Sequence, residues 1–209
     1  MLVLASASRA RRNLLNNAEI PHRVIVSDIN ENDFDQKDVI SLVDLLAFSK
    51  SSSVASKILV QELEDYSESK ISAVIGCDSL FEFEGKFFGK PKNIKEAIQR
   101  LQSFSSGSGF LHTGHCLLFR QRNFNRNRDL KFNGVLKEVI TTKIKFTEIS
   151  YEEILEYVKT GEPMQCAGGF ALDGIGGKFI SEINGCYSNV IGLSLPWLWN
   201  ALKKFQLLD

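Results

Sequence analysis

The chain has 209 residues, enough for one domain, or two closely packed lobes, with a buried core. Lys plus Arg and Asp plus Glu number 25 each, so the formal net charge of +0 gives no overall field that would attract nucleic acid or an acidic membrane surface. The four cysteines form no Cys-x-x-Cys pair, which argues against a zinc knuckle or a disulfide framework. With no window read as a membrane span and no secretory signal at the start, we expect a cytoplasmic protein without a membrane partner.

The first third of the chain predicts two strands and two helices. Residues 1–5 are typical of a short buried strand, and a serine-rich turn follows in which Ser6 or Ser8 is expected to cap a helix. Residues 22–29 alternate like a second strand. Residues 39–63 carry apolar side chains at helical spacing and predict one long or broken helix.

The middle of the chain predicts a buried strand, a hairpin and a helix. Residues 71–76 form a continuous apolar run, so we expect the strand to end just before Asp78. Residues 80–89 alternate around Glu84-Gly85, which indicates a hairpin. Residues 91–104 then predict a helix.

The second half continues the alternation of strands and helices. Strands are expected over residues 111–119 and 135–146, and a helix from Ser150, whose capping box with Glu153 marks its start. A glycine-rich stretch follows, and residues 195–205 predict a terminal amphipathic helix. Strands interleaved with helices throughout indicate an α/β fold.

The turn after the first strand is a candidate anion site. A small, serine-rich turn before a helix directs backbone N–H groups and the positive end of the helix dipole at one spot, around Ser6. Arg11 and Arg12 would add side-chain donors for phosphate. The alternative is a capped helix with solvated arginines.

Two further candidates flank the predicted hairpin. A carboxylate after a buried strand, here Asp78, can hold a metal or activate water, although aspartates at strand ends also serve as turn residues. A Walker A loop is excluded, because the glycine spacing is one residue short and Pro91 stands where Ser or Thr should be. Lys90 remains a candidate phosphate contact.

The remaining polar motifs carry weaker signals. Asp173, in the glycine-rich stretch, is a candidate acceptor for N–H donors of a nucleotide base, or an ordinary turn residue. His112 and His115 are expected to be structural, because residues three apart on a strand point to opposite faces. Residues 120–128, rich in arginine and asparagine, predict a solvated hairpin, with an RNA or phosphate contact as the alternative.

In this order, the segments resemble the Maf family of nucleoside triphosphate pyrophosphatases over nearly the whole chain. The family's Leu-Ala-Ser-x-Ser opening matches residues 4–8, and its helical Leu-Ala-x-x-Lys matches residues 46–50. The family's acidic position after the second strand corresponds to Glu31, and its strand-end aspartate corresponds to Asp78. Its Gly-Lys-Pro turn corresponds to residues 89–91 and its Ala-Gly turn to residues 167–168. Its terminal Val-Val-Gly-Leu-Pro corresponds to residues 189–196.

The resemblance implies a single domain, 1–209, with a Maf/ITPase-like elongated mixed sheet, flanking helices and two lobes around a central cleft. It implies hydrolysis of a nucleoside triphosphate between its α and β phosphates, with a divalent cation, Mg²⁺ or Mn²⁺, as cofactor. The implied catalytic residues are Glu31, Lys50, Asp78 and Lys90, with Ser6 and Arg11 binding phosphate. Glu31 and Asp78 would hold the metal; whether Asp78 is the general base or a metal ligand stays open.

Three positions associated with base choice in the family fall on Ala10, Ser79 and Asp173. The dTTP and UTP branch has Arg, Thr and Gln there, and the 7-methyl-GTP branch has an aromatic residue, Gln and Glu. We expect 7-methyl-GTP, because Asp173 keeps a carboxylate and Cys166-Ala167-Gly168 with Phe170 is similar to that branch. Ala10, however, lacks the aromatic ring.

Alternatives to this expectation stay open. Within the family, they are dTTP, UTP or CTP as substrate; outside catalysis, the chain would be a nucleotide-binding regulator of cell division. The partner we expect is the nucleoside triphosphate, with no nucleic acid. Trp197, Trp199 and Phe205 predict either packing on the core or a homodimer contact.

Overall fold

The structure, a computed structural model, describes residues 1–34, 36, 38–65, 71–121 and 131–207. Their contacts divide the chain into two compact units. The first comprises residues 1–78, 114–139 and 193–209, and the second comprises residues 79–113 and 140–192. Three strands contribute residues to both units: β3 (Ala73–Phe83), β5 (Ser108–Phe119) and β6 (Gly134–Phe146).

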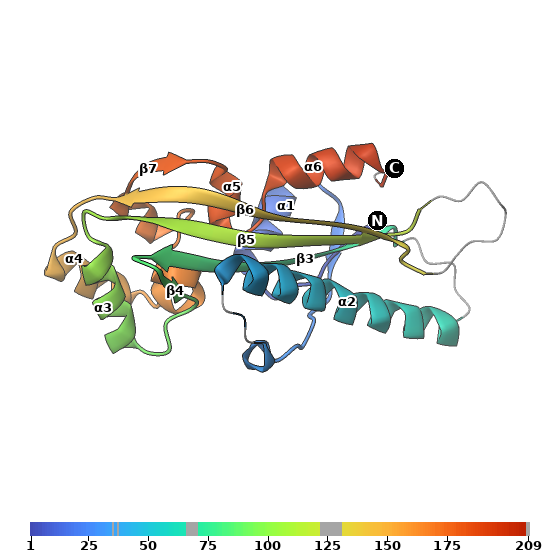
Figure 1. Ribbon diagram of the computed structural model, residues 1–209, viewed down its shortest axis with the longest axis horizontal. Coiled ribbons are helices and arrows are strands. Elements are labelled where there is room, and N and C mark those ends of the chain that lie inside the picture. The colour runs from blue at the N-terminus through green and yellow to red at the C-terminus, as the bar shows by residue number, and fades with distance from the viewer. Residues whose placement is uncertain (35, 37, 66–70, 122–130, 208–209) are drawn as a thin grey trace. The chain divides into compact units, whose positions relative to one another are not determined.

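The strands form one mixed sheet, shown in Figure 1, with the order β2-β1-β3-β5-β6-β7 and with β4 beside β3. Strand β1 (Leu2–Leu4) pairs parallel to both β2 (His22–Val24) and β3. Strand β4 (Lys86–Phe88) pairs antiparallel to β3, and β7 (Ile180–Asn184) antiparallel to β6. The predicted α/β fold with a mixed sheet is therefore confirmed.

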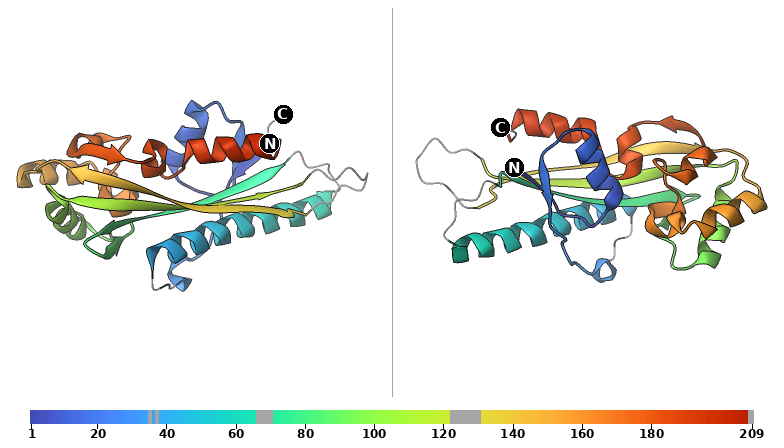
Figure 2. Two further views of the ribbon diagram at one scale, coloured as in Figure 1. Left: turned by 45° about the horizontal axis from the view of Figure 1, so that its top comes forward. Right: turned by 180° about the vertical axis from the view of Figure 1, so that it is seen from behind.

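In the first unit, helices cover both faces of the sheet. Helix α2 (Val39–Asp65) lies along one face, and α1 (Arg9–Asn17) and α6 (Leu195–Lys204) lie on the other (Figure 2). The core between α2 and the sheet is built from small and β-branched residues: Val3, Ala5, Ala47, Val54, Ala55, Ile58, Val74, Cys116 and Leu118. On the α6 side, the ring of Phe205 stacks on Phe119, with 4.2 Å between centroids, and Trp197 lies against His115. Of the three aromatic residues considered for a dimer contact, Trp199 alone is exposed.

Two glycines let α2 approach the sheet closely. A methyl group at Gly76 on β3 would overlap the carbonyl oxygen of Ala47, and one at Gly114 on β5 would overlap that of Val43. Both contacts are with helix backbone, which cannot move aside as a flexible side chain can. The missing side chains therefore set how near α2, and every residue on its inner face, lies to the strands.

The expectation that no window has the length and composition of a membrane span is wrong for one helix. Residues Val39–Gln61 of α2 have a mean hydropathy of 1.3 over a window long enough to cross a bilayer. The same helix packs against β3 and β5 at Gly76 and Gly114, and a core helix of a soluble protein meets the same criterion.

The second unit is built around phenylalanine. Helices α3 (Ile94–Phe104) and α4 (Tyr151–Lys159) and the short helix α5 (Tyr187–Ile191) belong to it. The ring of Phe81 lies at the centre of the core, with edge-to-face contacts to Phe104, Phe146 and Phe170 at centroid distances of 5.0 to 5.9 Å. Such rings bury large apolar areas and prefer this geometry.

Strand β3 continues to Phe83, six residues beyond the predicted end just before Asp78, and so includes the first arm of the predicted hairpin. Its first six residues are buried on both faces, whereas from Ser79 onward Phe81 and Phe83 are buried and the residues between them are half-buried. The end of the apolar run is therefore not the end of the strand; it marks where burial on both faces changes to burial on one. The hairpin at Glu84-Gly85 is confirmed, with φ of 50° and 72° as a type I′ turn requires.

Other predicted elements differ in extent. Strand β2 covers only His22–Val24, so the alternation over residues 25–29 is not a strand. Strand β7 and helix α5 were not predicted, because each is short and lies in a stretch where glycine breaks the periodicity. The capping box of Ser150 and Glu153 at the start of α4 is present as predicted.

Candidate active site

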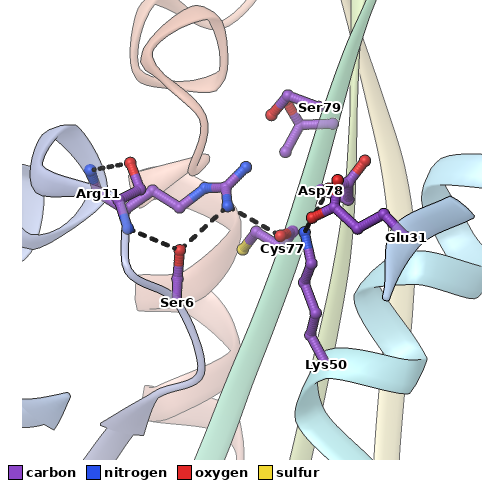
Figure 3. Close-up of polar contacts among 9 residues, drawn as sticks. Ser6, Arg11, Glu31, Lys50, Cys77, Asp78 and Ser79 are labelled. Atoms are coloured by element: carbon purple, nitrogen blue, oxygen red, sulfur yellow. Dashed lines mark hydrogen bonds and ion pairs between the residues drawn. The ribbon is translucent and has the colours of Figure 1, made fainter. Parts of the chain in front are cut away.

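The turn between β1 and α1 is organised by two serines and an arginine (Figure 3). Ser8 is the N-cap of α1, since its Oγ accepts from the backbone N–H of Arg11 at 3.3 Å. Ser6 Oγ accepts from the backbone N–H of Ser8 at 3.1 Å and from Arg11 Nη1 at 3.3 Å. The same Nη1 donates to the carbonyl oxygen of Cys77 at 2.9 Å. Arg11 therefore ties the turn to β3, while Arg12 points to solvent.

A lysine joins two carboxylates beside this turn. Lys50 Nζ lies 2.5 Å from Asp78 Oδ1 and 2.6 Å from Glu31 Oε1. Lys50 stands on α2 one turn after Ala47, the residue whose backbone contacts Gly76, so the close approach of the helix is what brings its ammonium to β3. Glu31 comes from a single 3₁₀ turn, Glu31–Asp33, and its side chain is 57% exposed.

The other charged residues in these contacts are buried, whereas the Glu31 side chain is largely exposed. Asp78, Lys50, Arg11 and Ser6 are each less than 10% exposed. Burial raises the pKa of the Asp78 carboxyl above its ordinary value; the positive charges of Lys50 and Arg11 oppose this shift, and Glu31 adds to it. A carboxylate with raised proton affinity is a better general base. Burial also raises the pKa of the neighbouring Cys77 thiol to about 12, which excludes it as a thiolate nucleophile.

The two carboxylates suit a hard divalent cation. No group of three or more His, Cys, Asp or Glu side chains comes together among the described residues, so there is no ready-made protein cage. Mg²⁺, however, is usually held by one or two carboxylates, with water and substrate phosphates completing its shell. Glu31 and Asp78, which share one ammonium, provide that donor set.

The Gly89-Lys90-Pro91 turn lies in the second unit, against the glycine-rich stretch. The carbonyl oxygen of Gly89 accepts from the backbone N–H of Gly168 at 3.1 Å and from Arg100 Nη1 at 2.6 Å. Arg100 also stacks over Phe88, 5.1 Å from the ring centroid. The turn is thus fixed by its backbone, and Lys90 itself is exposed.

Glu162 organises the loop that carries Asp173. Its carboxylate accepts from the hydroxyl of Tyr157 at 2.7 Å and from the backbone N–H groups of Ile175 and Gly176 at 3.0 and 2.9 Å. Burial, followed by hydrogen bonding to Glu162, raises the pKa of Tyr157, so it stays a neutral donor. Asp173 lies on the exposed side of this loop.

The other candidates are placed as follows. Ala10 lies half-buried in the first turn of α1. Ser79, the residue after Asp78, is half-buried in the second unit, with Oγ 3.0 Å from Thr113 Oγ1. Phe170 is buried in the phenylalanine core, so it does not offer a ring to a nucleotide base.

The histidines have structural partners, as predicted. His112 lies between Thr141 and Glu82, and His115 Nε2 accepts from the backbone N–H of Ser194. The arginine-rich segment 120–128 lies, apart from Arg120 and Gln121, outside the described residues.

The structure brings Ser6, Arg11, Glu31, Lys50 and Asp78 together in the first unit, whereas Ser79, Lys90 and Asp173 belong to the second. Sequence reasoning missed the residues that hold the backbone of the second unit in place, among them Arg100, Glu162 and Asn189. Glu162 follows a glycine at a helix end, and Asn189 opens the motif at residues 189–196, but neither signal distinguishes a supporting residue from a solvated one.

Comparison with known proteins gives one consistent family. The family model described as Maf-like protein matches residues 1–205. A nucleoside triphosphate pyrophosphatase of Prochlorococcus marinus is 53% identical over 204 residues, covering 98% of this chain and 97% of that protein. The protein of that name from Synechococcus sp. (strain CC9605) is 46% identical, covering 96% and 100%.

Among solved structures, the Staphylococcus aureus Ham1 protein matches 72% of each chain with 16% identity and a TM-score of 0.38. A likeness this weak supports no further argument.

Proposed function

The chain belongs to the Maf family as a nucleoside triphosphate pyrophosphatase, and we propose that it hydrolyses 7-methyl-GTP between the α and β phosphates, releasing 7-methyl-GMP and pyrophosphate. The observation that carries the proposed phosphate chemistry is the buried charged cluster of Arg11, Lys50 and Asp78, which Glu31 completes at the surface. Buried charges are costly to maintain, and such clusters are characteristic of functional sites.

The positive groups suit a triphosphate. Arg11 and Lys50 supply buried cationic donors, and Ser6 and the backbone N–H groups of the following turn supply neutral ones. Negative charge grows on the pyrophosphate as it leaves, and preorganised donors in a water-poor site stabilise that charge. We assign Lys90, the exposed lysine of the second unit, as a further phosphate contact.

Members of this family typically depend on a divalent metal. We propose that Glu31 and Asp78 hold Mg²⁺ or Mn²⁺ together with the phosphates of the substrate. When bound, the ion would neutralise phosphate charge and polarise the bond to be broken.

We assign Asp78 as the general base. A water oxygen bonds to the α phosphorus, its proton passes to the Asp78 carboxylate, and the bond from the α phosphorus to the bridging oxygen breaks, so that pyrophosphate leaves with the electron pair. Asp78 is less than 10% exposed, so little bulk water competes for the proton that it accepts. Lys50, in contact with the same carboxylate, keeps it oriented.

The hydrogen-bond donors of guanine support its assignment as the base. Asp173 is exposed and can accept hydrogen bonds from the N1–H and N2–H groups of guanine. A base edge that carries only acceptors offers no such donors. We assign Ala10 and Ser79 as the other base-specificity positions. Ala10 has no ring and Phe170 is buried, so the carboxylate of Asp173 is the feature that supports this base.

We further propose that the enzyme acts in the cytoplasm on free nucleotides, clearing modified or surplus ones, with no nucleic acid or membrane partner. A homodimer would have to use surfaces other than Trp197 and Phe205, which pack within the first unit.

A substrate panel tests the proposal. Purified enzyme with Mg²⁺ is given 7-methyl-GTP, dTTP, UTP and CTP, and pyrophosphate and orthophosphate are measured separately. We expect pyrophosphate, with the highest kcat/KM for 7-methyl-GTP. Faster turnover of dTTP or UTP would overturn the substrate assignment, and binding without turnover of any nucleotide would overturn the activity.

The role of Asp78 is tested by Asp78→Asn, which we expect to lower kcat by about 10³-fold, within the usual range for a general base. The matched control is Asp44→Asn, on the same unit, where Asp44 pairs with Lys137 at 2.6 Å outside the cluster. A kcat that is unchanged in Asp78→Asn would refute the assignment.

A further inference from the structure

The hydrogen-bond network behind Ser79 fixes the direction in which its hydroxyl donates. Thr113, on β5, is fully buried, and its Oγ1 lies 3.1 Å from the backbone carbonyl oxygen of Asn189 and 3.0 Å from Ser79 Oγ. A carbonyl oxygen can only accept, so Thr113 must donate its one hydroxyl hydrogen to Asn189. The hydrogen between the two hydroxyls then has to come from Ser79.

The position of Asn189 in this network is itself fixed. Its side chain is completely buried on α5, and its Nδ2 lies 3.0 Å from both the carbonyl oxygen of Ile140 and Thr142 Oγ1, and 3.4 Å from the carbonyl oxygen of Leu111. These acceptors belong to β5 and β6. The amide therefore ties α5 to two strands and holds the Asn189 carbonyl where Thr113 can reach it.

We infer that Thr113 is a specificity-determining positioning residue: by taking the hydrogen of Ser79, it makes Ser79 an acceptor toward the nucleotide base and so favours bases that present an exocyclic amino group. Ser79 is half-buried, whereas Thr113 and Asn189 are not exposed, so the serine oxygen is the part of the network that a ligand can contact. This inference rests on the proposed function, in which Ser79 faces the base.

The expected ligand class follows from donor and acceptor chemistry. Guanine offers N1–H and N2–H groups and cytosine an exocyclic amino group, whereas the corresponding positions of hypoxanthine and uracil lack that amino group. With its hydrogen directed at Thr113, Ser79 can pair with an amino group. It meets the O4 carbonyl of uracil only as acceptor against acceptor, and it finds no N–H donor at C2 of hypoxanthine. With Thr113 removed, the hydroxyl can rotate and donate.

The test compares competitors that differ by one amino group. Inhibition constants of GTP against ITP, and of CTP against UTP, are measured as competitors of the best substrate for wild type, Thr113→Val, Thr113→Ser and Ser79→Ala. We expect wild type to prefer at least one amino-bearing partner, and Thr113→Val and Ser79→Ala to reduce that preference by about fivefold, the effect of one neutral hydrogen bond. Thr113→Ser, which keeps the hydroxyl, should retain it.

The outcomes separate the inference from the proposed function. Pyrophosphate release by wild type tests the activity alone. If wild type turns over substrate but Thr113→Val leaves both preference ratios unchanged, or if Thr113→Ser loses the preference as fully as Thr113→Val, the inference is wrong. Thermal melting of each variant is measured alongside. A merely structural role for Thr113 would lower the melting temperature and turnover for every nucleotide without changing the ratios.

Discussion

The two units bury different kinds of polar group. The first buries a charged cluster: Lys50 pairs with Asp78 in the middle of β3, and Arg11 of α1 donates to the carbonyl oxygen of the neighbouring Cys77. The second buries one charge, Arg100, which pairs with Glu96, and a connected network of neutral groups: the hydroxyls of Thr113 and Thr142 and the amide of Asn189. Ionic groups attract phosphate whatever base is attached, whereas neutral donors and acceptors distinguish one base edge from another. The difference predicts that phosphate chemistry and base choice can be disturbed separately.

The largest effect that tests this comparison is expected from Lys50→Met. Removing the ammonium leaves Asp78 and Glu31 without their shared cation and removes a phosphate donor, so kcat/KM should fall by about 10³-fold. The fall should be the same, within a few-fold, for purine and pyrimidine nucleotides. Lys137→Met, which removes an exposed lysine of the same unit, is the control. Losses of kcat/KM that differ strongly between purine and pyrimidine nucleotides would contradict the separation of phosphate chemistry from base choice.

Gly76→Ala addresses how the charged cluster is built. The added methyl would overlap the carbonyl of Ala47, so α2 must shift and carry Lys50 away from Asp78. We expect a loss of about 2 to 3 kcal/mol in the free energy of unfolding, together with most of the activity. Chemical denaturation measures the first and pyrophosphate release the second.

The matched control for Gly76→Ala is Gly89→Ala in the second unit, where the nearest atom to an added methyl is a Leu80 side-chain carbon at 3.5 Å. Its stability should change by less than about 0.5 kcal/mol. Equal losses of stability at Gly76 and Gly89 would show that the close approach of α2 does not cause the destabilisation by Gly76→Ala.

Asn189→Ala probes the neutral network of the second unit. The variant removes the Asn189 donor from the buried carbonyl oxygen of Ile140 and leaves Thr142 Oγ1 with the Cys186 N–H alone, and we expect it to lower the free energy of unfolding by about 2 kcal/mol. Asn17→Ala, on the exposed side of α1, is the control and should change stability little. A loss no larger than in the control would mean that the network contributes nothing to the fold.

Glu162→Gln is expected to have a smaller effect on stability. The amide keeps the shape of the carboxylate but places a donor beside N–H or O–H groups of Tyr157, Ile175 or Gly176, at a cost of about 1 kcal/mol. The KM for the substrate should rise, because the loop carrying Asp173 loses its anchor, while kcat changes little. Glu152→Gln, in the exposed first turn of α4, should alter neither. A fall in kcat at unchanged KM would contradict this account.

The smallest expected effect is a pH dependence of stability. Burial raises the pKa of Asp78, so the folded protein holds this proton more tightly than the unfolded chain does. The stability that protonated Asp78 contributes is fully present below the pKa of this carboxyl in the unfolded chain. It is lost as pH rises through the pKa of the carboxyl in the folded protein. Asn cannot titrate. The melting temperature of Asp78→Asn relative to wild type should therefore be higher at pH 8 than at pH 4.5, and the opposite trend would show that pairing with Lys50 outweighs burial.

Much of the fold could be predicted from the sequence, because periodicity reports burial. The long helix of residues 39–65, the hairpin at Glu84-Gly85 and the capped helix α4 each carry a local signal that the structure retains. Strand β3 could not be bounded in this way, since the pattern of Ala73–Phe83 changes where the sheet loses its cover on one face. That change depends on where helices pack, which no local window contains.

The candidate site was accessible mainly through family resemblance. Ser6, Lys50 and Asp78 are far apart in sequence, and nothing in their spacing alone says that they meet; their roles stay proposals. Thr113 and Asn189 were not predicted at all. Nothing in the flanking residues marks either one, and only the geometry shows that one hydroxyl determines the donor of the next.

The chain passes between the two units at residues 78/79, 113/114, 139/140 and 192/193, within three strands and once just after α5. Neither unit is therefore a continuous stretch of sequence. No single recombination event can exchange the second unit, with Ser79, Thr113 and Asp173, for that of a relative while leaving the first intact. The two segments that make up the second unit, 79–113 and 140–192, would have to be exchanged together, with residues 114–139 of the first unit kept between them.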